Sequence, residues 1–127
     1  MPIKLPILFA GSTSKAILDT LFEPNNTYSF IREDLAEKLG LIYRFRDPRS
    51  FNIAPFRLLT TTKDVICLSF TINNLRLRDE FMIIPGLPED VIFGDTTIRK
   101  WGMKLDFDNN AVIIDPRVAE FMLKKAI

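Results

Sequence analysis

The chain has 127 residues, a length that suits one domain with a single hydrophobic core. Hydrophobic residues make up 47% and charged residues 26%, as in an ordinary globular protein. The 17 basic and 16 acidic residues leave a net charge of +1 without a basic stripe, which argues against nucleic acid or an anionic membrane as the main partner.

Two residue types narrow the chemistry further. The chain has no histidine, which removes Ser-His and Cys-His catalysis and His-ligated metal sites. Its only cysteine, Cys67, cannot form an intramolecular disulfide, and we expect it to be buried in a strand. The apolar run at residues 3–9 is short and broken by Lys4 and Pro6, so we expect no signal peptide, no membrane span and a cytoplasmic location.

The first half of the chain predicts strands and one short helix. Residues 3–9 and 15–19 predict the two strands of a hairpin. Turn-forming residues at 21–28 predict a loop. Acidic residues followed by leucines at i and i+4 predict a short helix over about 32–39, and the region 41–84 that follows is rich in strand-forming residues.

Within that region, residues 63–73 and 75–84 predict a second hairpin that turns at two asparagines. An apolar run at 90–93 predicts a buried strand. Asp95 is expected to cap a short helix over 96–101.

A third hairpin, at residues 103–107 and 111–114, precedes a C-terminal helix over about 116–126 that begins at Asp115-Pro116. We expect the apolar stripe of this helix to dock it onto the rest of the domain, or else to form a dimer contact. The stripe consists of Val118, Phe121 and Met122, with Leu123 widening it.

These elements predict an all-β, or mainly β, single domain over residues 1–127. Hairpins joined by very short helices indicate a closed or nearly closed barrel, because a doubly wound α/β sheet needs longer crossover helices.

Two segments point to a chemistry. The first is an apolar strand that ends in Asp-Thr at residues 16–20, followed by Ser-Phe-Ile at 29–31 and a helix that ends in Leu-Gly-Leu at 39–41. The second is Asp-Val-Ile-Phe-Gly at 90–94, which leads through a short helix and a glycine to a strand that ends in Asp-Phe at 106–107.

In these elements and their order the chain resembles the retropepsin-like aspartic proteases, over about residues 3–114. The resemblance implies a closed acid-protease β-barrel with two short helices, to which this chain adds its C-terminal helix. It also implies a homodimeric endopeptidase that needs no cofactor or metal and cleaves a peptide or protein substrate. Asp19 of each subunit would be catalytic, Thr20 would hydrogen-bond across the interface, and Gly94 would lie close behind the active-site loop.

The chemistry explains why a second copy is needed. One carboxylate activates a water molecule while another donates a proton, and two neighbouring carboxylates do this by sharing one proton. A chain with a single Asp-Thr strand end obtains the second carboxylate from a twofold-related copy. Small retropepsins form much of their dimer interface from terminal strands. Because we expect a helix at the C-terminal end of this sequence, a dimer would need other contacts, or would not form.

Glycine is missing at two places where the family brings backbone to substrate. Leu21 replaces the glycine that follows Asp-Thr, and the stretch 53–61, which corresponds to the substrate-covering flap, contains none. The flap residues are Ala54, Pro55, Phe56 and Arg57. These departures favour the alternative of a catalytically inactive module that binds a peptide or partner, or that dimerises.

The remaining acidic residues have simpler interpretations. We expect Asp90 and Asp106 to face solvent. The acidic pairs near residues 79–80 and 108–110 match no calcium-loop spacing, so we expect no metal site.

Overall fold

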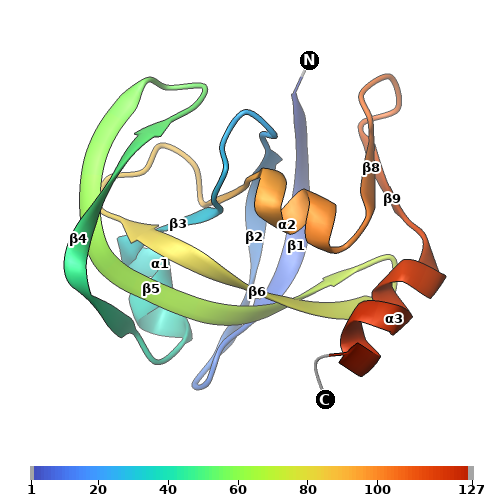
Figure 1. The fold of residues 1–127 in the computed structure, drawn as a ribbon, viewed down its shortest axis with the longest axis horizontal. Helices are drawn as coiled ribbons and strands as arrows, with labels where there is room; N and C mark the ends of the chain where they lie inside the picture. Colours follow the sequence, from blue (N-terminus) through green and yellow to red (C-terminus); the bar gives the residue numbers. More distant parts are fainter. Residues whose placement is uncertain (1, 126–127) are drawn as a thin grey trace.

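The computed structural model describes residues 2–125, with side chains at all of these positions except 119, 122, 123 and 125. Strands dominate, as predicted, and three helices lie between or after them (Figure 1). In chain order the elements are β1 (Ile3–Ala10), β2 (Lys15–Phe22), β3 (Phe30–Arg32), α1 (Glu33–Leu39), β4 (Tyr43–Ile53), β5 (Leu58–Ile72), β6 (Leu75–Ile84), β7 (Val91–Phe93), α2 (Asp95–Lys100), β8 (Met103–Asp106), β9 (Ala111–Ile114) and α3 (Pro116–Lys125).

The main sheet closes into a barrel. Its strand order is β1-β2-β7-β3-β6-β5-β4, and an additional pairing of β1 with β5 completes the ring. β4 lies outside this ring and pairs only with β5, so it forms an open edge. The predicted closed β architecture is confirmed.

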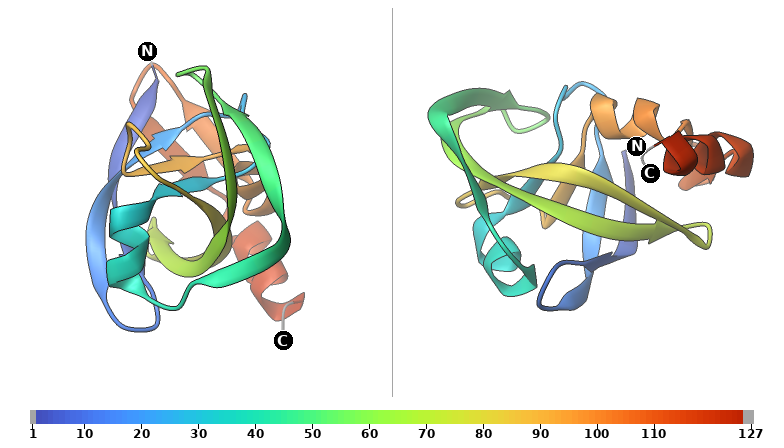
Figure 2. Two further views of the ribbon diagram at one scale, coloured as in Figure 1. Left: turned by 90° about the vertical axis from the view of Figure 1, so that its left-hand side faces the viewer. Right: turned by 60° about the horizontal axis from the view of Figure 1, so that its bottom comes forward.

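The remaining elements gather at one end. Figures 1 and 2 show α2, the β8–β9 hairpin and α3 at the end of the barrel opposite the β4–β5 hairpin. The β8–β9 hairpin forms a separate two-stranded sheet. No helix in the described part of the chain is both long enough and apolar enough to cross a membrane.

Phenylalanine rings fill the barrel interior. Phe9, Phe70, Phe81 and Phe93 contact one another with ring centroids 4.8–6.1 Å apart, and Phe22 packs edge-on to Phe93 at 5.1 Å. All five are at most 1% exposed. Each such ring stabilises the fold by about 1.5–3 kcal/mol through burial alone. The high phenylalanine content therefore reflects the core.

Local turn chemistry explains the hairpins. Asn73 and Asn74 have φ values of 51° and 63°, the left-handed values that a two-residue hairpin turn requires and that asparagine tolerates. This turn connects β5 to β6 as predicted. Gly86 has a φ of 68° in the next turn.

Two predictions about individual residues are wrong. Gly94, not Asp95, is the N-cap of α2, and Asp95 lies in its first turn, where its carboxylate pairs with Arg99 at 2.8 Å. Cys67 is exposed, because β5 turns Ile66 and Leu68 inward and Cys67 outward.

The C-terminal helix contacts β6, and its apolar stripe is partly exposed. Val118 is 39% exposed and Phe121 is 62% exposed, so these two side chains are only partly covered by the rest of the domain. The side chains of Met122 and Leu123 lie outside the described residues. Asp115 does cap α3 as predicted, since its Oδ1 accepts the backbone N–H of Arg117 at 2.9 Å.

Candidate active site

Asp19 lies in the middle of the β1–β2 hairpin, opposite Pro6 of β1. Strand alternation directs Asp19 and Leu21 to one face of β2 and Thr20 to the other. Asp19 is exposed, whereas Leu21 and Thr20 are buried, at 2% and 0% exposure. The face of β2 that carries both residues is therefore open at Asp19 and covered at Leu21.

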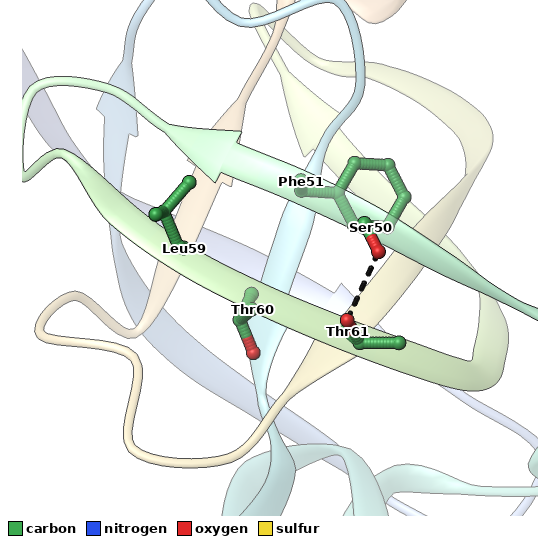
Figure 3. Close-up of a pocket in the computed structure, with 5 residues that line it drawn as sticks. All are labelled: Ser50, Phe51, Leu59, Thr60 and Thr61. Atoms are coloured by element: carbon green, nitrogen blue, oxygen red, sulfur yellow. Dashed lines mark hydrogen bonds between the residues drawn. The ribbon is translucent and has the colours of Figure 1, made fainter.

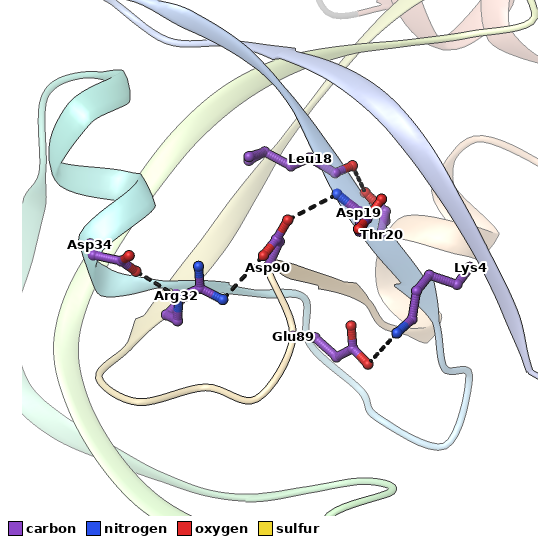
Figure 4. A network of polar contacts seen from close by, with 8 residues as sticks. All are labelled: Lys4, Leu18, Asp19, Thr20, Arg32, Asp34, Glu89 and Asp90. Atoms are coloured by element: carbon purple, nitrogen blue, oxygen red, sulfur yellow. Dashed lines mark hydrogen bonds and ion pairs between the residues drawn. The ribbon is translucent and has the colours of Figure 1, made fainter.

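A polar network holds the backbone of Asp19 in place (Figure 4). The N–H of Asp19 donates to Oδ2 of Asp90 at 3.1 Å. Oδ1 of Asp90 accepts a hydrogen bond from the Arg32 guanidinium, also at 3.1 Å, and the Arg32 backbone N–H donates to the Asp90 carbonyl at 3.0 Å. The start of α1 and the residue before β7 are thus linked to the candidate catalytic strand.

Two further ion pairs flank this network. Lys4 contacts Glu89 at 2.8 Å; this bond raises the pKa of the Lys4 ammonium, and the charges of Asp19 and Asp90 add to the effect. Arg32 also pairs with Asp34 at 2.7 Å, which lowers the pKa of the Asp34 carboxyl. The network around Asp19 thus contains two basic and three acidic side chains, and each basic group is paired with at least one carboxylate.

The network bears on where a second carboxylate could come from. Asp90 is the neighbouring acid, but both of its carboxylate oxygens accept hydrogen bonds, and one of them faces an arginine. The Asp90 carboxylate is therefore already engaged by the Asp19 N–H and by Arg32. The prediction that Asp90 is simply solvent-exposed is wrong, since its side chain is 30% exposed.

Thr20 bonds within its own chain. Its Oγ1 donates to the carbonyl of Leu18 at 3.2 Å, and the residue is fully buried. Both edges of the segment Thr20–Phe22 are also occupied, by β1 on one side and β7 on the other. A second copy can therefore approach Asp19 across the open face of β2, but it cannot add a strand beside that segment.

The open face next to Asp19 is apolar. Leu8 and Ile17 lie directly opposite one another on β1 and β2, and they are 39% and 70% exposed. By strand alternation they share the face of Asp19. An exposed pair of large aliphatic side chains beside a carboxylate is a surface that a peptide or a second copy could cover.

Leu21 belongs to a second hydrophobic cluster, separate from the phenylalanine core. The cluster lies between the barrel and the β4–β5 hairpin, and its partly buried members include Phe51 and Leu58 of that hairpin. Its buried members are Leu21, Phe30, Ile53, Val65, Met82, Ile84, Leu87 and Ile92. The Leu21 side chain thus fills space that a glycine at this position would leave open.

The β4–β5 hairpin above this cluster contains the stretch 53–61 that the sequence suggests as a flap, and we use the word flap below for residues 50–61 of this hairpin. Ala54, Pro55, Phe56 and Arg57 form its tip, and Arg57 adopts a φ of 53° in the left-handed region. A hollow of about 300 Å³ lies on the flap (Figure 3). It is lined by Ser50, Phe51, Leu59, Thr60 and Thr61 and does not include Asp19.

The loop between β2 and β3, residues 23–29, supports the flap tip. Its Asn26 hydrogen-bonds the Ala54 backbone, and its Tyr28 packs edge-on against Phe51 with centroids 5.6 Å apart. Gly94 lies directly behind the loop, where a Cβ atom would collide with the backbone oxygens of Asn26 and Tyr28.

Within residues 2–125, the other acidic side chains form no cluster that could hold a metal ion. Asp106 is half-buried and caps the β8–β9 turn; bonds from the side chain and backbone of Asn109 lower the pKa of its carboxyl. Among the described side chains, no group of three His, Cys, Asp or Glu residues is placed to hold a metal ion. Although Cys67 is exposed, partial desolvation by its neighbours raises the pKa of its thiol, and the charge of Glu80 adds to the shift.

Comparison with solved structures identifies the fold of this chain. No family model and no curated protein matches the sequence. The crystal structure of the retroviral protease-like domain of Ddi1 from Leishmania major matches with a TM-score of 0.66 at 14% identity, covering 91% of this chain and 89% of that one. The chain has a retropepsin-like fold. A second retropepsin-like structure, EIAV protease complexed with the inhibitor HBY-793, matches with a TM-score of 0.61 at 10% identity, covering 84% of this chain and 94% of that one.

The sequence singled out Asp19, Leu21 and the flap candidates, which stay predictions, and it gave no indication of Asn26 or of the Arg32–Asp90 pair as site residues. Asn26 follows a proline and another asparagine, so it was interpreted only as a turn residue. Arg32 and Asp90 are 58 residues apart, and the antiparallel pairing of β3 with β7 brings them together. An arginine directly after one buried strand and an aspartate directly before another were the only signals.

Proposed function

We propose that the chain is an aspartic endopeptidase that acts as a homodimer, with Asp19 of each copy supplying one carboxylate. The proposal rests on the exposed Asp19 carboxylate, whose backbone is held by Asp90, on a retropepsin-like barrel. The substrates would be peptides or unfolded protein segments. The proposed location is the cytoplasm, in keeping with a single unpaired cysteine.

In this mechanism two Asp19 carboxyl groups share one proton. The ionised carboxylate accepts a proton from a water molecule, whose oxygen attacks the peptide carbonyl. The protonated carboxyl then donates its proton to the amide nitrogen as the carbon–nitrogen bond breaks. Two like charges held close together resist simultaneous ionisation, which keeps one group protonated at mildly acidic pH.

Dimer formation would use the open face of β2. A twofold axis beside Asp19 would bring the two carboxylates together and would cover Leu8 and Ile17 of both copies. Asp90 cannot replace the second copy readily, because both of its oxygens are already bonded.

A second candidate function is a non-catalytic module that binds a partner or dimerises. Leu21 favours it, because this side chain is 2% exposed and occupies space between barrel and flap. The two candidates differ in a single measurable property, which is peptide-bond cleavage that depends on Asp19.

The test is cleavage of unfolded casein at mildly acidic pH by the wild type and by Asp19→Asn. Asp108→Asn, a matched change at an exposed turn of the β8–β9 hairpin, is the control. We expect Asp108→Asn to cleave like the wild type and Asp19→Asn to be slower by about a hundredfold or more. Equal rates for Asp19→Asn and wild type would contradict catalysis, and a folded wild type that does not cleave would favour the second candidate.

A further inference from the structure

The side chain of Asn26 makes two hydrogen bonds to one backbone residue at the flap tip. Its Nδ2 donates to the Ala54 carbonyl at 2.9 Å, and its Oδ1 accepts the Ala54 N–H at 2.8 Å. Two opposed residues of an antiparallel sheet exchange the same pair of bonds. The Asn26 carboxamide therefore satisfies Ala54 in the way that the backbone of an added strand would.

Asn26 is fixed to the barrel rather than to the flap. Its carbonyl accepts the N–H of Asp95 at the start of α2, at 2.7 Å, and its own N–H donates to the Glu23 carbonyl at 3.1 Å. The residue is 5% exposed, and Gly94 leaves room for its backbone. If the Asn26–Ala54 bonds break, the flap is the part that moves.

Apolar contacts complete the closed arrangement. Phe51 of the flap packs edge-on against Phe30 at 5.2 Å, and Ile53 is fully buried in the cluster that contains Leu21. The Ala54 backbone groups are thus bonded and Ile53 is buried by contacts within this chain, whereas Phe56 at the tip is 37% exposed.

We infer that Asn26 is a built-in competitor of peptide binding: it occupies the Ala54 backbone groups to which an extended peptide would bind and so holds the flap closed. The peptide part of this inference rests on the proposed function. An extended peptide offers an N–H and a C=O at the spacing that Ala54 requires, and strand addition of this kind depends on the peptide backbone rather than on its side chains. Removing the Asn26 carboxamide should free Ala54 for such a peptide.

The first test reads the flap itself, by amide protection factors in Asn26→Ala and in the matched neighbour Asn25→Ala. Loss of two hydrogen bonds should lower protection in residues 51–59 by about ten- to hundredfold. Protection in β6 should not change, which shows that the barrel remains folded. Unchanged flap protection in Asn26→Ala, or an equal loss in Asn25→Ala, would overturn the inference.

A second variant separates the two bonds. Asn26→Asp keeps the acceptor for the Ala54 N–H but places a carboxylate oxygen against the Ala54 carbonyl at neutral pH. Below about pH 4 the carboxyl is protonated and can donate again, so flap protection should recover on acidification. Asn26→Ala should show no such recovery. Equal behaviour of the two variants at both pH values would contradict a hydrogen-bonding role.

The third test measures competition without cleavage. Fluorescein-labelled unfolded casein is titrated with Asp19→Asn and with the double variant Asp19→Asn/Asn26→Ala. The double variant should bind about tenfold more tightly or better, because the peptide no longer displaces the carboxamide. Equal affinities would overturn the competition. This readout is independent of turnover, so failure of the peptidase proposal would leave the result interpretable.

Discussion

Leu21 determines how much room lies beneath the flap. It follows the Asp-Thr pair and points to the same face as Asp19, but the flap covers it and leaves Asp19 exposed. A buried leucine side chain stabilises a fold by about 1.5–3 kcal/mol through burial. The same packing reduces the space in which a substrate side chain could lie.

Replacing Leu21 by alanine should therefore destabilise the chain. We expect Leu21→Ala to lower the free energy of unfolding by about 2–4 kcal/mol, measured by urea unfolding. Leu41→Ala is the control, because Leu41 is 61% exposed and its truncation should cost less than about 0.5 kcal/mol. Similar losses in the two variants would show that Leu21 is not packed as described.

Single residues also show what sequence can reveal. The inward direction of Ile66, Leu68 and Phe70 on β5 could be predicted from their alternation, and it implies that Cys67 faces outward. The general tendency of cysteine to be buried led to the opposite expectation. The position of a residue in a periodic pattern was the better guide here than its type.

At the scale of elements, the hairpins were predictable because their turns are local. Asn73 and Asn74 favour left-handed backbone whatever surrounds them. The length of β2 was not predictable in the same way. It continues past Asp19 to Phe22 because β1 and β7 supply hydrogen-bonding partners on both edges, and β7 is some seventy residues away in the chain.

The loop of residues 23–29, which contacts the flap, packs closely against Gly94. Gly94 has a φ of −94°, which alanine adopts freely, but its Cβ would collide with two backbone oxygens of the loop. Gly86 offers the opposite case, with a φ of 68° and open space around it.

We therefore expect Gly94→Ala to cost more stability than Gly86→Ala. The first should lower the free energy of unfolding by about 1–3 kcal/mol or more through overpacking, and the second by about 1 kcal/mol through backbone strain. Urea unfolding of both variants compares the two mechanisms directly. A larger loss in Gly86→Ala would mean that the loop moves aside without cost.

At the scale of the whole molecule, the barrel presents one exposed Asp19 and one β4–β5 hairpin. The neighbouring Asp90 is engaged with Arg32 and the Asp19 backbone, so the proposed peptidase chemistry would need a second copy. The sequence motifs predicted this fold correctly because they come from distant parts of the chain, and their strands β2 and β7 pair side by side in the barrel. They could not predict that the flap is closed on Asn26, since that contact joins residues 28 positions apart through side-chain geometry alone.

The central claim is that two copies of Asp19 act together, and subunit mixing tests it most directly. Wild type and Asp19→Asn are refolded together in equal amounts, and casein cleavage is compared with the same total concentration of wild type. If a dimer needs both carboxylates, random pairing leaves about a quarter of the activity. About half of the activity would mean that each chain works alone, and would contradict the account.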